Sequence, residues 1–61
     1  MFVTKKKSYR VTIITDTSDS VYDHIVEESE IEAKATAIRW FIIDRGVAAT
    51  FDIIDTKVEE T

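Results

Sequence analysis

The stretch SEIEAKATAIRWFIIDRG, residues 29–46, carries both a start signal and a stop signal for one helix. Ser29 and Glu32 match the capping box S-x-x-E, in which each side chain accepts a hydrogen bond from the backbone amide of the other residue. At the far end an arginine complements the helix dipole, and Gly46 supplies the left-handed residue on which many helices end. We therefore expect a helix from about Glu30 to Arg45.

Two β-strands are predicted before this helix. Residues 9–15, YRVTIIT, are rich in β-branched side chains that alternate between two sides. The side expected to face the core carries Tyr9, Val11 and Ile13. Residues 16–20, DTSDS, are typical of a turn, and residues 21–27, VYDHIVE, give the second strand of a hairpin. The facing of this second strand stays open, because one side carries Val21 and Ile25 and the other carries Tyr22 and Val26.

A third strand is predicted after the helix, over residues 47–59, and we expect residues 59–61 to fray. Its core side would carry Val47, Ala49, Phe51 and Ile53. Because the helix reverses the chain, placing the first strand between the other two makes every neighbouring pair antiparallel. The prediction is therefore a two-layer β-β-α-β domain of the α+β class, with a three-stranded antiparallel sheet in the order 2-1-3 and one helix on one face.

The predicted helix has two apolar faces. At 100° per residue, the stripe expected to cover the sheet consists of Ile31, Ala35, Ile38 and Ile42. A second stripe consists of Ala33, Ala37 and Trp40, with Phe41 lying between the two stripes. We interpret Ala33, Ala37, Trp40 and Phe41 as a dimer interface, because small residues allow a second backbone to approach and tryptophan anchors contacts. The alternative is a curled sheet that takes Trp40 into one broad core.

The size of the chain favours one domain that associates with itself. A domain of 61 residues buries only about 60% of the surface of its unfolded chain, so its core is marginal. The sequence has no cysteine and a single histidine, His24, which excludes disulfides, thiol catalysis and a histidine metal cage within one chain. Self-association is the remaining source of stability, so we expect a homodimer; the alternative is a well-packed monomer. Residues 1–8 form a basic N-terminal segment without a secretion signal, and with no apolar stretch of spanning length a cytoplasmic location is expected.

We expect no enzymatic activity, cofactor or metal. Four serines have only His24 available as a base, and no glycine-rich phosphate loop is present. Asp16 and Asp19 lack the spacing of a calcium loop, so a turn is the better interpretation.

Charge is divided unevenly along the chain. Residues 1–15 carry four basic residues and no acid, whereas residues 16–61 carry all twelve acids against four basic residues, a net charge of −8. Six of the acids follow one another from the turn, along the second strand and into the helix start: Asp16, Asp19, Asp23, Glu27, Glu28 and Glu30. Such acids can protect a sheet edge from aggregation. We interpret them instead as a surface that binds a basic protein, such as one whose lysines and arginines grip DNA phosphates.

Two alternatives come from other function classes. Lys5, Lys6 and Lys7 with the nearby Tyr9 could grip phosphates and stack a base, although the remainder of the chain, at −8, would repel a nucleic acid. The chain could also be a dimeric adaptor whose contacts are apolar and centred on Trp40.

In size, acidity and absence of cysteine the whole chain resembles the small phage-encoded host-takeover proteins. Some of these are DNA mimics that block the bacterial nucleoid protein HU. The resemblance implies a non-enzymatic inhibitor that occupies the basic DNA-binding surface of an HU-like host protein in the host cytoplasm. The chain carries no motif that is diagnostic of these proteins, and its Lys5–Lys7 cluster departs from a purely acidic mimic.

Overall fold

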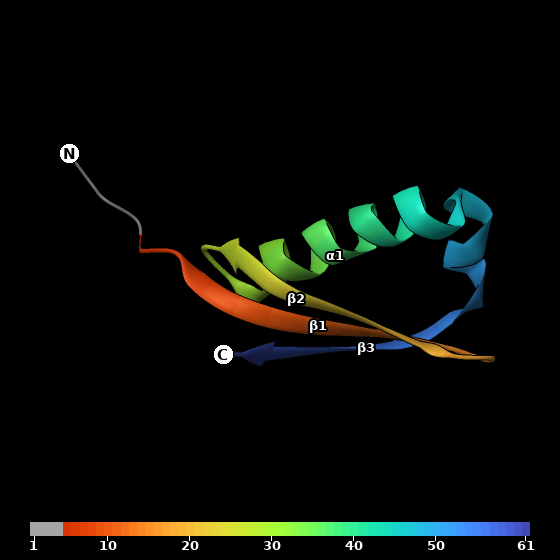
Figure 1. Ribbon diagram of the computed structural model, residues 1–61, viewed down its shortest axis with the longest axis horizontal. Coiled ribbons are helices and arrows are strands. Elements are labelled where there is room, and N and C mark those ends of the chain that lie inside the picture. The colour runs from red at the N-terminus through yellow and green to blue at the C-terminus, as the bar shows by residue number, and fades with distance from the viewer. Residues whose placement is uncertain (1–4) are drawn as a thin grey trace.

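A three-stranded antiparallel sheet carries one helix on one of its faces (Figure 1). The computed structural model describes residues 5–61. The elements are β1 (Lys7–Thr15), β2 (Asp19–Glu27), the helix α1 (Glu30–Arg45), the 3-10 helix η1 (Val47–Asp52) and β3 (Ile53–Glu60). The strand order is β2-β1-β3, so β1 is central and the other two strands are edges. The predicted α+β architecture, strand order and helix bounds are confirmed.

Strand β1 supplies the floor of the core through strict alternation. Tyr9, Val11 and Ile13 are almost fully buried beneath the helix, whereas the residues between them face the open side of the sheet. Thr15, at the end of the strand, is also buried, and its hydroxyl donates to the carbonyl of Ser18 at 2.8 Å and closes the turn into β2. The predicted facing of this strand is confirmed.

A β-bulge in β2 resolves the facing that the sequence left open. Tyr9 pairs with Ile25 and Val11 pairs with Tyr22, so two residues of β2 oppose the single residue Arg10. One of these two, His24, has φ +58°, the left-handed region that ordinary side chains rarely adopt. Because of the extra residue, Tyr22 and Ile25 both lie on the helix side although they are three positions apart, and each contributes to the core.

The helix packs on the sheet through residues that were predicted to form a dimer interface. Ala33, Ala37 and Phe41 are completely buried, whereas Ile31 is 82% exposed and Ala35 is also exposed. The predicted sheet-facing stripe was therefore wrong for Ile31 and Ala35, whereas Ile38 packs against the core and Ile42 is half-buried. The small alanine side chains let the helix backbone approach the strands closely. Together with Phe41 they fill the narrow space between the layers.

The predicted helix signals are present at both ends. The Ser29 hydroxyl accepts from the amide of Glu32 at 3.3 Å, although no return bond from the Glu32 side chain occurs in the described part of the chain. Gly46 has φ +90° and donates its amide to the carbonyl of Ile42 at 2.7 Å. A side chain at position 46 would be strained at this φ, so glycine is required here.

The third strand begins later than predicted. Residues 47–52 form the 3-10 helix η1, with the Thr50 hydroxyl donating to the carbonyl of Val47 at 2.6 Å. The chain must pass from the helix layer to the sheet layer here, and six residues at a rise of about 2 Å each span roughly 12 Å. Val47 and Phe51, predicted to face the core, are instead 67% and 89% exposed, whereas Ala49 and Ile53 pack against the core as expected.

The end of the chain is paired rather than frayed. Glu59 and Glu60 belong to β3 and lie opposite Arg10 and Tyr9. The Thr61 amide donates to the carbonyl of Ser8 at 2.8 Å. Of the predicted basic segment 1–8, residues 1–4 lie outside the described residues, and Lys7 and Ser8 are part of β1.

The alanine packing predicts a difference between two neighbouring helix positions. We expect Ala37→Leu to lower the free energy of unfolding by about 1–3 kcal/mol, because extra methyl groups have no room between helix and sheet. Ala35→Leu, on the exposed side, should change it by less than about 0.5 kcal/mol. Urea unfolding at one fixed protein concentration measures both values, and equal effects would contradict the described packing.

The bulge predicts an unusual tolerance for glycine. His24→Val should destabilise by about 1–2 kcal/mol, because a β-branched side chain clashes with the backbone at positive φ. His24→Gly should be neutral or stabilising, since glycine adopts this conformation without strain. The control Val26→Gly, two residues further along the same strand, should destabilise by about 0.5–1 kcal/mol. The same chemical unfolding assay ranks the three variants.

Candidate protein-binding surfaces

The six predicted partner-binding acids follow one border of the molecule. Asp16 lies in the turn before β2, and the following residues occupy the start, bulge and end of β2, the connection after it and the first position of α1: Asp19, Asp23, Glu27, Glu28 and Glu30. All are exposed except Glu27, which is half-buried. A strand of nine residues spans about 30 Å, so these carboxylates form a long row, called here the acidic border.

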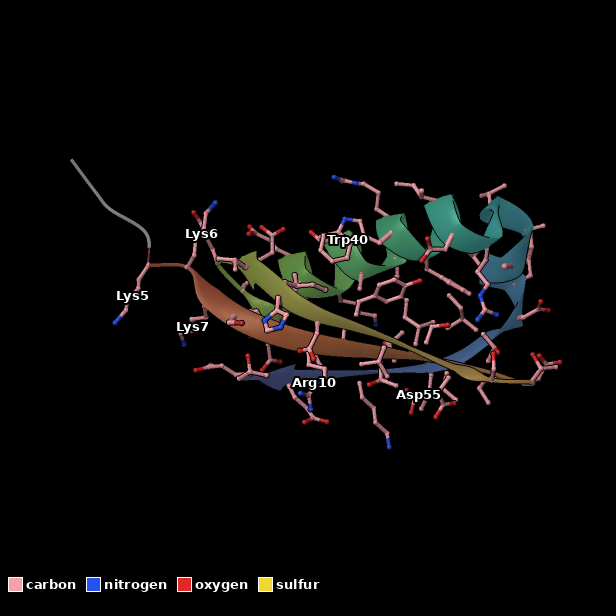
Figure 2. All side chains as sticks on the ribbon, viewed as in Figure 1. Lys5, Lys6, Lys7, Arg10, Trp40 and Asp55 are labelled. Atoms are coloured by element: carbon pink, nitrogen blue, oxygen red, sulfur yellow. The ribbon has the colours of Figure 1, made fainter. Side chains whose placement is uncertain are left out.

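Two members of the acidic border are held by neighbours. Asp23 Oδ1 accepts from Arg10 Nε at 3.3 Å on the open face of the sheet, where the labelled Arg10 points away from the helix (Figure 2). This hydrogen bond is the main reason that the pKa of the Asp23 carboxyl lies below its usual value. Glu27 Oε2 accepts from the Thr36 hydroxyl at 2.5 Å, which ties the end of β2 to the helix.

Basic residues adjoin one end of the acidic border. Lys7 lies opposite Glu27 in the β1–β2 register, and its ammonium group is 3.5 Å from a carboxylate oxygen of Glu60. Figure 2 places Lys5, Lys6 and Lys7 together at this end of the sheet. The lysines offset the field of Glu27 and its neighbours, and at the opposite end Arg45 Nη1 donates to Ser18 Oγ at 3.5 Å, beside Asp16 and Asp19.

Burial removes one part of the predicted nucleic-acid site. Tyr9, expected to stack a base beside the lysines, is only 3% exposed and belongs to the core. Its ring therefore cannot stack on a nucleotide in this fold, and that expectation was wrong. The lysine cluster remains exposed.

The predicted dimer interface is mostly covered within a single chain. Ala33, Ala37 and Phe41 are completely buried against the sheet and offer no surface to a partner, so their assignment to an interface was wrong. Trp40 alone among the four remains accessible, at 39% exposure. Sequence spacing correctly indicated two apolar stripes, but it could not tell which of them the sheet would cover.

Trp40 instead lies in a small cluster on the β2 side of the helix. Its ring meets that of Tyr22 edge to face, with centroids 6.2 Å apart. The Tyr22 hydroxyl donates to Asp44 Oδ2 at 3.0 Å, and Tyr22, Trp40, Ile43 and Asp44 line a shallow pocket. Burial and this hydrogen bond raise the pKa of Tyr22. The cluster places Trp40 between the two predicted alternatives, packed against the sheet edge yet partly accessible.

Two exposed surfaces that contain apolar residues were not predicted from the sequence. Val21 and Val26 lie on β2 and are each more than half exposed. On the other side of the helix, a groove between α1 and β3 is lined by Lys34, Ile38, Thr50, Ile53, Ile54, Asp55 and Thr56. Simple alternation along the strand did not predict the second surface, because a register shift between Ile14 and Thr15 allows Ile53 to pack against the core while Ile54 also lines the groove.

Within residues 5–61, the sixteen-residue α1 is too short to cross a membrane and η1 is shorter still. Comparison of the chain with protein-family models, with curated proteins and with solved structures gives no match.

The Arg10–Asp23 pair predicts an acid-sensitive contact. The pKa of Asp23 is lower in the folded chain than in the unfolded one, so the pair stabilises the fold above the usual carboxyl pKa, and this contribution is lost as the pH falls. We expect Arg10→Met to raise the pKa of Asp23 toward its usual value, because donor and charge are both removed. Carbon-detected NMR titration of the carboxyl group measures this. Arg39→Met, on the exposed side of the helix, is the control and should leave the pKa unchanged.

Proposed function

We propose that the chain is a non-enzymatic binding protein whose acidic border occupies the basic DNA-binding surface of another protein, such as a nucleoid protein. The observation that supports this proposal most directly is the position of six carboxylates along one exposed edge strand and its flanking turns. Proteins that bind DNA present lysine and arginine to a regular row of phosphates, and a row of carboxylates offers the same partners.

The acidic border is also fixed in space, which favours binding. The backbone of β2 is paired to β1 along most of its length, and the bonds to Arg10 and Thr36 hold two of its carboxylates. Side chains that are ordered before association lose less conformational entropy when a partner arrives. The border therefore differs from an acidic disordered tail of the same charge.

In this proposal the end of the border that carries Asp16 and Asp19 contacts the partner first. Asp19 pairs with Ile14 at the opposite end of the β1–β2 register from Lys7, and Asp16 lies in the exposed turn between β1 and β2. Electrostatic attraction between this end and a basic surface would steer association and weaken with added salt. The end of the border next to Lys5–Lys7 would then lie outside the contact, or its lysines would reach phosphates of the displaced nucleic acid.

A competition experiment tests the proposal. HU bound to a fluorescent DNA duplex is titrated with the protein, and fluorescence anisotropy reports release of the DNA. We expect release at low salt, and about tenfold less potency when Asp16 and Asp19 are both changed to lysine, because two attractive charges become repulsive. Raising the salt should weaken competition by the unmodified protein.

The matched control changes two acids outside the acidic border. Asp44→Lys with Asp52→Lys alters the net charge by the same amount, and neither residue contacts a member of the border. Equal loss in both double variants would show that only net charge matters and would contradict a defined site. Failure to release DNA at any salt concentration would contradict the proposal for HU-type partners, and a direct shift of free DNA by the protein would favour the lysine cluster instead.

A further inference from the structure

The exposed edge of β3 carries a sequence that is complementary to itself. Residues 54–58 read Ile-Asp-Thr-Lys-Val. Thr56 is the central residue, an acid and a base flank it on either side, and an apolar residue stands at each end of the segment. Strand β3 pairs with β1 on one side only, and the order β2-β1-β3 leaves its other side without a strand among the described residues. Such an edge is a template for pairing with another chain.

The backbone of β3 presents hydrogen-bonding groups on this free side. The Thr61 amide donates to the carbonyl of Ser8 on β1, and amide directions alternate along a strand, so the amides of Thr56 and Val58 point away from β1. Consistent with this, the Thr56 amide donates to the carboxylate of Asp55 at 2.8 Å, a bond within the strand that a neighbouring strand could replace. The free edge is therefore ready to accept a strand.

We propose that two copies of the chain pair through β3 in an antiparallel, two-fold symmetric arrangement centred on Thr56. In this register Thr56 lies opposite Thr56 of the second copy. Asp55 lies opposite the second copy's Lys57, and Lys57 lies opposite its Asp55. Ile54 and Val58 also lie opposite each other across the two copies. The result is one continuous six-stranded sheet with both helices on the same face.

Charge selects this register over its neighbour. A two-fold axis at Lys57 would place Lys57 opposite itself and Asp55 opposite Glu59, which sets like charges against each other. The axis at Thr56 instead places opposite charges together on both sides of the centre, on the open face of the sheet, where Figure 2 shows Asp55 pointing away from the helix. Opposite charges across antiparallel strands stabilise pairing, and like charges oppose it.

Apolar exposure on the helix side of the sheet supports the same contact. Ile54 is 68% exposed beside the groove that α1 and β3 form, and Ile38 lines the opposite wall. Among the described residues, the side-chain hydrogen bonds between α1 and the strands go to β2, through Thr36 and Asp44, and none goes to β3 on the groove side. Pairing at β3 would place Val58 of the second copy against Ile54 and join the two grooves.

The other edge of the sheet is unsuited to the same pairing. Strand β2 is interrupted by its bulge at Asp23 and His24, and it carries the acidic border, which would repel its own copy. Irregular and charged edges are common ways of preventing strand association. The dimer is thus assigned to β3 alone, and it does not depend on the proposed function of the border.

Charge exchange tests the proposed register. Asp55→Lys and Lys57→Asp should each weaken the dimer about tenfold or more, because two cross-strand pairs per dimer become like-charged. The double variant Asp55→Lys with Lys57→Asp should recover the original affinity to within about threefold, since the pairs form again with reversed sign. The single variants change net charge in opposite directions, so weakening by both cannot be a net-charge effect. Sedimentation equilibrium measures the dissociation constant, and circular dichroism confirms that each variant is folded.

Single cysteines give an independent measurement, because the chain has none of its own. Opposed Cα atoms in a hydrogen-bonded antiparallel pair are about 5.5 Å apart, within disulfide range, so Thr56→Cys should yield a covalent dimer on oxidation. Lys57→Cys should cross-link poorly, because the two copies of that position lie beyond about 7 Å. A monomer at every concentration, equal cross-linking at both positions, or a dimer that Trp40→Ala dissociates and Asp55→Lys leaves intact would each overturn the proposal.

Discussion

The close approach of α1 to the sheet through Ala33 and Ala37 determines the rest of the structure. Both side chains are completely buried, and Phe41 continues the same stripe one turn later with a much larger side chain. Figure 1 shows the helix and the sheet diverging toward η1, so side-chain size increases along the stripe as the space between the layers widens. If the helix were rotated so that Ile31 and Ile42 faced the sheet, their larger side chains would hold the two layers apart. Phe41 would then lose the space between the layers in which it is buried.

This constraint explains which features the sequence predicted and which it did not. Caps are local, so Ser29 and Gly46 located the helix ends, and strict alternation located the buried side of β1. The choice between two apolar stripes depends instead on the distance between layers, which no local pattern records, and isoleucine looked more suitable than alanine. The bulge at His24 was equally hidden, because histidine carries no signal for positive φ comparable with that of glycine. Of the candidate site, the acids of the border could be read from the sequence, but the accessible part of the helix could not.

The two edges of the sheet therefore have different properties. Strand β2 is irregular at its bulge, and its carboxylates would repel a second copy of the strand. Hydrogen bonds that involve Thr36 and Asp44 join this strand to the helix. Strand β3 has no side-chain hydrogen bond to the helix among the described residues, and Ile54 is exposed beside a groove. The bulge and the carboxylates thus protect one edge while the other stays free, which is the condition for a dimer that closes after two copies rather than a growing sheet.

Closure of this kind would also give the acidic border a defined geometry. In a six-stranded sheet joined at β3, the two β2 strands form the outer borders, five strand spacings of about 4.8 Å apart, or roughly 24 Å. Each border would carry its own row of carboxylates, and the antiparallel two-fold would orient the rows in opposite directions, as the two strands of a duplex are oriented. A basic surface with its own two-fold symmetry could then contact both rows, whereas a surface that fits only one row would gain nothing from the dimer. The competition assay can be repeated with Asp55→Lys and Lys57→Asp, which weaken the dimer, and with the double variant, which restores it. Weaker competition by both single variants but not by the double variant would connect the two surfaces, and equal competition by all three would show that each surface acts alone.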